Sequence, residues 1–171
     1  MKKNFDASFV WLMEDEGGFV NDPRDKGGMT NLGVTQANWE AYLGRPVTER
    51  EMRALTPDVV KPFYQARYWA KVKGDALPSG VDYCVFDMAV NSGPGQASRF
   101  IQRVCAVNAD GIIGPKTLDA IHSDDPTELI NAFCDDRLEW LKTLSSFKTF
   151  GKGWTVRVER VRKRALTLTL S

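Results

Sequence analysis

Apolar side chains recur every three or four residues along most of this chain, which is the spacing of one face of an α-helix. The pattern predicts one helix near the N-terminus and almost only helices after residue 35. The predicted helices span residues 5–15, 36–43, 48–55, 57–72, 79–90, 94–106, 115–121, 126–147 and 154 onward. The residues between them, including 147–153, are expected to be loops. The expected fold class is therefore mainly α.

Side chains that cap helices support these boundaries. Thr35, Thr48 and Thr56 each precede a predicted helix, and Thr48 has Glu51 three residues later, as in a capping box. Asp125 is the expected cap of the long helix that follows it. The helix starts are thus specified by local side-chain chemistry as well as by the apolar pattern.

The predicted helix 79–90 is apolar on nearly every side, so we expect it to be the central, buried helix. Asp87 lies within it, and a buried carboxylate needs a partner, so we interpret Asp87 as a structural hydrogen-bonding residue. Asn91 follows on the same helical face, just before Ser-Gly-Pro-Gly. Its place at the helix end makes Asn91 a candidate for a binding cleft.

The stretch 14–35 interrupts the helical pattern. It contains two Gly-Gly pairs and several acids, with apolar residues between them. A buried structural loop would not gather so many acids, because an unpaired buried carboxylate is costly. A plain surface linker would not need the glycine pairs and the apolar residues. The stretch is therefore expected to bend the backbone so that carboxylates face a cleft, with at most a short hairpin between residues 17 and 34.

Glu16 is the best candidate for a catalytic acid in this stretch. The pair Gly17-Gly18 should end the preceding helix, which places Glu16 at its C-terminus. The helix dipole, neighbouring acids and nearby aromatic residues would each raise the pKa of a carboxyl there. A general acid that works near neutral pH needs a raised pKa. The alternative is an ordinary solvated acid at a frayed helix end.

Asp25 and Thr30 are candidates to act opposite Glu16. Gly27 and Gly28 allow a turn between them that would bring both side chains toward Glu16. An inverting glycosidase needs an acid, an opposing carboxylate and a polar group that holds water. Asp22 is a rival for the opposing carboxylate, although Asn-Asp-Pro is more typical of a turn.

The chain resembles glycoside hydrolase family 108, the muramidases found in phage endolysins and prophages. The resemblance rests first on Glu-Gly-Gly-Phe, Asn-Asp-Pro, Asp25, Gly-Gly, Thr30 and Gly-Val-Thr between residues 16 and 35. It continues in Tyr-Trp at 68–69, in 86–93, at Gln102 and in Asp-Gly-Ile-Ile-Gly-Pro-Lys-Thr at 110–117. These later motifs are similar to the family and its peptidoglycan-binding C-terminal region.

The resemblance implies a lysozyme-like helical fold and cleavage of the β-1,4 bond between N-acetylmuramic acid and N-acetylglucosamine. Glu16 matches the family's catalytic acid, with Asp25 and Thr30 in the roles described above. Residues 1–171 would form one lysozyme-like domain, with a catalytic lobe at 1–91 and a C-terminal helical lobe at 92–171. Candidate substrate-binding residues are Asn31, Tyr64, Tyr68 and Asn91. The two tyrosines suit either the core or stacking on sugar rings.

Two other functions stay open at this point. A lytic transglycosylase would use one acid–base glutamate and let the muramic 6-hydroxyl replace water, and the presence of Asp25 and Thr30 argues against it. A non-catalytic peptidoglycan-binding protein would have no use for an acid with a raised pKa. The expected function is therefore a peptidoglycan hydrolase, with a phage or prophage endolysin as its setting.

The formal net charge of +1 predicts no nucleic-acid partner, but the charge is uneven. Residues 147–171 contain seven bases and one acid. This amphipathic C-terminal helix is either packed with a solvated basic face or directed at an anionic envelope surface. The bacterial partner is expected to be peptidoglycan, and the chain to be a monomer.

The chain contains three cysteines within apolar patterns, at residues 84, 105 and 134, which we expect to be buried thiols rather than disulfides. The loop with Asp110 and Gly111 lacks the acids of a calcium-binding loop and is interpreted as a turn. The proposed chemistry requires no metal and no cofactor.

The first residues are too polar for a signal peptide, and no apolar run is long enough to cross a membrane. We therefore expect synthesis in the host cytoplasm and action in the periplasm or cell wall after release, for instance through a holin pore.

Overall fold

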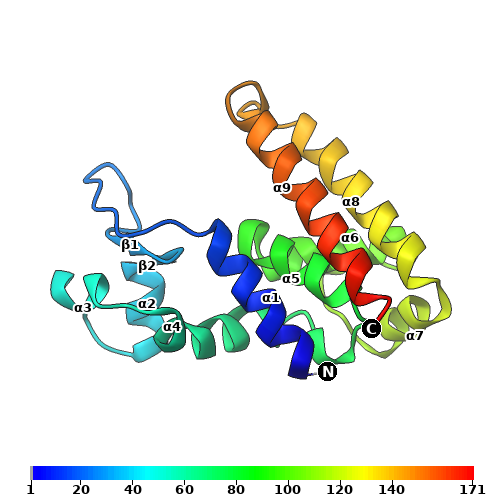
Figure 1. The fold of residues 1–171 in the computed structure, drawn as a ribbon, viewed down its shortest axis with the longest axis horizontal. Coiled ribbons are helices and arrows are strands. Elements are labelled where there is room, and N and C mark those ends of the chain that lie inside the picture. Colours follow the sequence, from blue (N-terminus) through cyan, green and yellow to red (C-terminus); the bar gives the residue numbers. More distant parts are fainter. Residues whose placement is uncertain (1) are drawn as a thin grey trace. The chain divides into compact units, whose positions relative to one another are not determined.

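A computed structural model describes residues 2–171, with side chains from Asn4 on, and confirms the mainly α fold (Figure 1). Its helices are α1 (Lys2–Asp15), α2 (Gln36–Leu43), α3 (Glu49–Arg53), α4 (Pro57–Tyr64), α5 (Val81–Ser92), α6 (Pro94–Val104), α7 (Pro115–Ser123), α8 (Pro126–Lys142) and α9 (Phe147–Leu168). A π-helix η1 (Gln65–Trp69) continues α4, and η2 (Gly74–Ala76) is a 3₁₀ turn. Strands β1 (Thr30–Asn31) and β2 (Val34–Thr35) form the short hairpin, which extends one residue beyond the predicted stretch.

The capping signals read from the sequence are confirmed. The Thr35 hydroxyl accepts the backbone N–H of Asn38 at 3.2 Å, and Thr48 forms the full capping box with Glu51. The Asp125 carboxylate caps α8 by accepting the backbone N–H of Glu128 at 3.0 Å. Such signals act within one turn of helix, which is why the sequence alone reveals them.

The start of the last helix is a correction. A loop is predicted over 147–153, but α9 begins at Phe147, and α8 ends at Lys142 instead of continuing to 147. Gly151 is buried inside α9, and a Cβ atom there would lie 2.7 Å from the Phe147 ring. The glycine is therefore required by side-chain packing one turn away, and it does not break the helix.

The chain forms two compact units. One is Phe9–Arg67, and the other combines residues up to Ser8 with Tyr68–Ser171. The predicted lobes at 1–91 and 92–171 stay a prediction. The unit Phe9–Arg67 is built on an aromatic cluster in which Phe63 contacts Trp39, Tyr42 and Tyr64 with ring centroids 5.4–5.8 Å apart. These rings hold α2 and α4 together.

In the other unit, α5 is the central helix, as predicted. Every residue from Val81 to Ala89 is buried. Helices α8 and α9 lie side by side as an antiparallel pair (Figure 1), and both pack against α5. Phe5 from the start of α1 completes this core by contacting Trp69 and Phe86 at 5.3 and 5.8 Å.

Asp87 has an arginine partner on each of two helices. Arg137 of α8 donates to one carboxylate oxygen at 2.7 Å, and Arg157 of α9 donates to the other at 2.9 Å. The nearby guanidinium groups hold the pKa of Asp87 below its usual range, although burial acts in the opposite direction. Asp87 thus has a structural role, as predicted: with Arg137 and Arg157 it forms an ion triad that joins α5, α8 and α9.

The cysteines are free thiols, as expected, although only two of them are fully buried. Cys84 on α5 and Cys134 on α8 are in contact, with sulfur atoms 3.9 Å apart. Cys105 is half-buried, and burial raises the pKa of its thiol to about 11. No helix in the described part of the chain is long and apolar enough to cross a membrane.

Gln102 of α6 organises the loop that follows it. Its side-chain nitrogen lies within hydrogen-bond distance of three acceptors, Asp110, the carbonyl of Ile112 and Thr117, at 2.9–3.1 Å, while its oxygen accepts the N–H of Gly111. The Asp110 carboxylate also accepts the N–H of Ile112 at 2.9 Å, which confirms the predicted turn.

Candidate functional site

The loop after α1 folds back on itself through backbone hydrogen bonds. Val20 and Thr30 exchange both N–H to O=C bonds at 2.8 Å, and Thr30 also pairs with Thr35 in the hairpin. Leu32 and Gly33 form the two-residue turn between β1 and β2, and both have positive φ, at 51° and 77°. A two-residue turn with positive φ at both positions matches the twist of the strands it joins.

This turn positions Glu16. The N–H of Leu32 donates to the carbonyl of Gly17 at 3.0 Å, which brings the turn next to the end of α1. The half-buried side chain of Glu16 then lies over Gly33: a Cβ atom added there would be 2.7 Å from Glu16 Cδ and 2.6 Å from the hydroxyl of Tyr64. The absence of a side chain at Gly33 therefore makes room for the carboxyl of Glu16 beside the Tyr64 hydroxyl.

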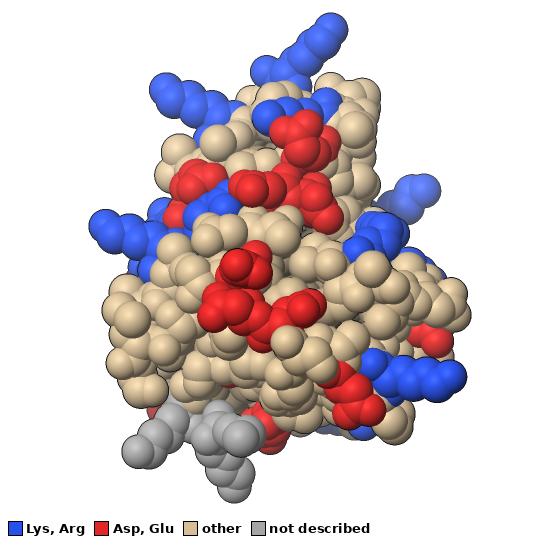
Figure 2. All heavy atoms as spheres, turned by 90° about the vertical axis from the view of Figure 1, so that its right-hand side faces the viewer, with Lys and Arg blue, Asp and Glu red and all other residues tan. Residues whose placement is uncertain are grey.

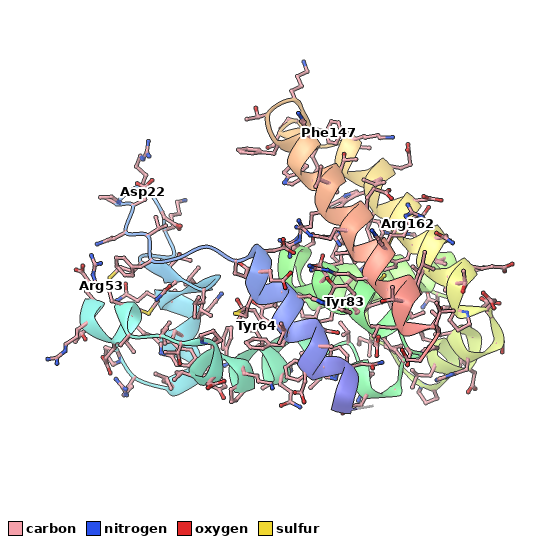
Figure 3. All side chains as sticks on the ribbon, viewed as in Figure 1. Asp22, Arg53, Tyr64, Tyr83, Phe147 and Arg162 are labelled. Carbon is pink, nitrogen blue, oxygen red and sulfur yellow. The ribbon has the colours of Figure 1, made fainter. Side chains whose placement is uncertain are left out.

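Asp25 and Asp22 occupy different environments in the same loop. Asp25 is exposed, and its carboxylate accepts the N–H of Gly27 at 2.8 Å. Asp22 lies near the tip of the loop (Figure 3) and forms an ion pair with Arg24 at 2.8 Å. Its hydrogen bonds with Arg24 hold the pKa of Asp22 below the usual range. This pairing is that of a turn residue, and it leaves Asp25 as the carboxylate better suited to act on water.

Thr30 and Asn31 are neighbours with different exposure. Thr30 is half-buried, at the point where the backbone pairs with both Val20 and Thr35. Asn31 is buried, and its amide donates to the carbonyl of Met52 at 2.8 Å. The Asn31 side chain therefore fastens the hairpin to α3, and its role in substrate binding stays a prediction.

Tyr64 lies in the core, which is one of the two places that its sequence pattern allowed. Its ring is only 1 % exposed, and its hydroxyl donates to the carbonyl of Leu32 at 2.7 Å. The ring is covered by its neighbours, and the hydroxyl holds the turn that carries Gly33, so contact of Tyr64 with a sugar stays a prediction. Tyr68 is half-buried and Asn91 is exposed, so each has surface that a ligand can reach.

The structure adds positions that sequence reasoning missed. Gly33 was recognised only as part of a motif, although its positive φ and its closeness to Glu16 make it a spatial requirement of the site. Trp140 of α8 and Trp154 of α9 line a cavity together with Asn91. The sequence could have indicated these two residues only by their being tryptophans, because tryptophan combines a large apolar face with one polar N–H and so suits a binding site.

The basic end of the chain is partly neutralised. Arg162 points from α9 toward α8 (Figure 3), where it pairs with Asp135, and it also pairs with Glu159 at 3.2 Å. On the face shown in Figure 2, acidic side chains gather in the middle and basic ones project at the margins. The exposed lysines of α9 are Lys148, Lys152 and Lys163. Charge attraction by α9 would depend chiefly on these three exposed lysines.

Among the described residues, no group of three or more His, Cys, Asp or Glu side chains is placed to hold a metal ion. What the loop after α1 offers is one half-buried carboxyl over a glycine, one exposed carboxylate and one hydroxyl. These are the groups that acid-assisted attack by water requires.

Comparison with known families gives two matches. Residues 9–93 match the family described as Glycosyl hydrolase 108, and residues 96–159 match the family described as Predicted Peptidoglycan domain. The first match contains the loop after α1 and all of α5. The second contains α6 from Gln96 on, α7 and α8 and about half of α9.

Among solved structures, the chain is similar to SagA of Brucella abortus, with 46 % sequence identity and a TM-score of 0.89. The similarity covers 100 % of this chain and 98 % of that one. No curated protein matches the chain.

Proposed function

Because this chain belongs to the glycosyl hydrolase 108 family and carries a peptidoglycan domain, we propose that it is an N-acetylmuramidase. Its substrate would be the β-1,4 bond between N-acetylmuramic acid and N-acetylglucosamine. The observation that carries the proposal is the position of Glu16, half-buried at the end of α1 and lying over Gly33 beside the Tyr64 hydroxyl. Glu16 would protonate the glycosidic oxygen as the bond breaks.

Asp25 and Thr30 supply the second half of the proposed reaction. An exposed carboxylate can orient or deprotonate the attacking water, and the Thr30 hydroxyl would help to hold that water. The glycosidic bond breaks as the oxygen of water bonds to the anomeric carbon, and Glu16 gives its proton to the leaving sugar. Asp22 is not assigned this role because its carboxylate is paired with Arg24.

A transglycosylase would use the muramic 6-hydroxyl in place of water, so the two reactions differ in their products. Hydrolysis leaves a reducing end on each cleaved strand, whereas transglycosylation leaves a 1,6-anhydro sugar without one. Reducing-end analysis of digested peptidoglycan therefore decides between them. New reducing ends equal in number to the cleaved bonds support hydrolysis.

The catalytic assignment is tested by Glu16→Gln, with Asp22→Asn as the matched control from the same loop. We expect Glu16→Gln to lower the rate of peptidoglycan cleavage by about 10²–10⁴-fold while the melting temperature stays close to that of the parent protein. Zymography and turbidity loss of cell-wall suspensions measure the activity. Near-parental cleavage by a folded Glu16→Gln protein would remove Glu16 from the mechanism.

The proposed setting is lysis by a phage or prophage, in which the enzyme reaches the wall from the cytoplasm through a pore formed by another protein. The peptidoglycan domain supports a target outside the cytoplasm. Expression in a bacterial host with and without a co-expressed holin tests this. Lysis that depends on both the holin and Glu16 supports the proposal, and lysis without the pore contradicts the route.

A further inference from the structure

A cavity of about 300 Å³ lies between α5, α8 and α9, inside the compact unit that contains all three helices. Trp140 and Trp154 line it from α8 and α9, and Asn91 lines it from the end of α5. Its volume is at the lower end of the range for small-molecule sites, and it is large enough for a single sugar ring or a comparable group. None of the residues assigned to bond cleavage lines it.

The cavity borders the ion triad. Arg137 and Arg157 belong to its lining, and both donate to Asp87, which is fully buried. Buried ion pairs stabilise a fold little, because removing each charge from water is costly and apolar side chains of similar size would fill the space as well. Guanidinium groups fixed by Asp87 are, however, pre-oriented donors for the oxygen atoms of a ligand. The triad therefore gives this cavity rigid polar groups.

The two indole rings give the cavity rigid apolar faces. Trp140 is held by the edge of Phe100 with ring centroids 5.5 Å apart, and Trp154 is stacked with Phe150 at 5.9 Å. Both tryptophans are half-buried, so part of each ring is accessible. A pyranose ring carries apolar C–H faces and polar edges, which matches a site that combines indole rings with amide and guanidinium donors.

The surrounding secondary structure argues against an extended peptide as the ligand. Peptides are commonly bound by pairing with an exposed strand edge, and the described lining residues all come from helices or the segment joining them. An N-acetylated sugar needs no such edge, because its acetamido group is satisfied by one donor and one acceptor. The Asn91 side chain is exposed at the cavity and provides both.

We propose that this cavity binds one N-acetylhexosamine residue of the peptidoglycan glycan strand, through residues that take no part in bond cleavage. The sugar would rest against Trp140 or Trp154, and its acetamido group would bond to Asn91. Most of the lining lies within the segment 96–159 that matches the peptidoglycan domain, which identifies the polymer. This inference rests on the proposed function only for the identity of that polymer, and sugar binding can be measured without cleavage.

The test uses the whole chain with Glu16→Gln, so that the probe is not hydrolysed, and measures binding of tri-N-acetylchitotriose by calorimetry and indole fluorescence. We expect Asn91→Ala to weaken binding about fivefold, as for a lost hydrogen bond, and Trp154→Leu to weaken it about tenfold or more. The matched control is Asn108→Ala, since Asn108 is another exposed asparagine of the same unit outside the cavity. It should bind like the parent.

Because Asn91 is exposed, its replacement should leave the fold intact even if Trp154→Leu does not fold. Unchanged chitotriose binding by Asn91→Ala would overturn the proposal. The proposal would also be overturned if the protein bound a soluble stem tripeptide in place of the sugar and lost this binding on Asn91→Ala. Failure of the muramidase proposal would appear separately, as an absence of peptidoglycan cleavage by the parent protein while chitotriose binding still depends on Asn91.

Discussion

The stability of the compact unit that contains α5 should decrease as the pH rises through the range in which Asp82 loses its proton. This carboxylate is only 2 % exposed, and it accepts hydrogen bonds from Asn4, from the N–H of Gly80 and from the N–H of Tyr83 at 2.7–2.8 Å. Burial raises the pKa of Asp82 from 3.8 to about 6. The folded protein therefore binds this proton more tightly than the unfolded chain.

The direction of the pH effect follows from this difference. Between about pH 4 and pH 6 the folded state holds a proton that the unfolded state has lost, so the free energy of unfolding falls as the pH rises. Below this window the contribution of Asp82 is fully present, and above it the contribution has been lost. A pKa raised from 3.8 to about 6 corresponds to a loss of about 3 kcal/mol.

Asp82→Asn removes the titration and keeps the shape of the side chain. Its oxygen can still accept both N–H groups that now reach Asp82 Oδ1, from Gly80 and Tyr83. Its amide nitrogen would face Asn4, whose own amide can turn to present oxygen, because Ser79 offers a hydroxyl that both donates and accepts. We therefore expect the variant to fold.

The assay is urea unfolding of both proteins at several values between pH 4 and pH 7. The stability of the parent relative to Asp82→Asn should fall by about 3 kcal/mol across this range. Surface carboxylates that titrate in both proteins cancel in the comparison. Parallel stability curves for the two proteins would refute the reasoning, because they would show that Asp82 ionises at the same pH in both states.

Three other perturbations test the candidate site and the basic helix. Gly33→Ala places a Cβ atom where Glu16 and Tyr64 now lie, and the φ of 77° costs an alanine about 1 kcal/mol. We therefore expect the rate of cleavage to fall at least tenfold while the protein stays folded. Full activity in a turbidity assay would show that the added Cβ atom does not displace Glu16. Asp25→Asn should reduce cleavage strongly and Asp22→Asn should reduce it less, since Asp22 is paired; the opposite order would reassign the base. Changing the three exposed lysines of α9 to glutamine should reduce sedimentation with cell envelopes at low salt but not at high salt, where attraction is screened; equal sedimentation at low salt would leave the helix with a packing role only.

The sequence predicts those parts of the fold that depend on neighbours along the chain. Thr48 and Glu51 form their capping box within one helical turn, so their types and spacing reveal it. The loop after α1 is similarly marked by its glycines and acids. In contrast, Asn31 and Tyr64 look like polar groups available to a ligand, and only the packing of distant segments shows that they are buried.

Long-range partners explain the remaining differences. Asp87 was expected to need a partner, but its two arginines lie 50 and 70 residues away, and no local pattern identifies them. From the sequence, Gly151 looks like a residue that breaks a helix. Only the position of the Phe147 ring, which leaves no room for a Cβ atom at residue 151, explains why this glycine lies within α9. The cavity lined by Trp140 and Trp154 was missed for the same reason, because these two tryptophans come to line one cavity only when α8 and α9 pack together.

The division of the chain into units has a consequence for the order in which the protein folds. Phe9–Arg67 is continuous in sequence, so all its internal contacts are available as soon as residue 67 has left the ribosome. The first eight residues belong to the other unit, and Asn4 bonds to Ser79 and Asp82, which are 75 and 78 residues further on. Contacts so distant in sequence form slowly, because the chain between them must first be closed into a loop. The residues before Phe9 therefore leave the ribosome before the unit Phe9–Arg67 but reach their final positions after that unit has folded.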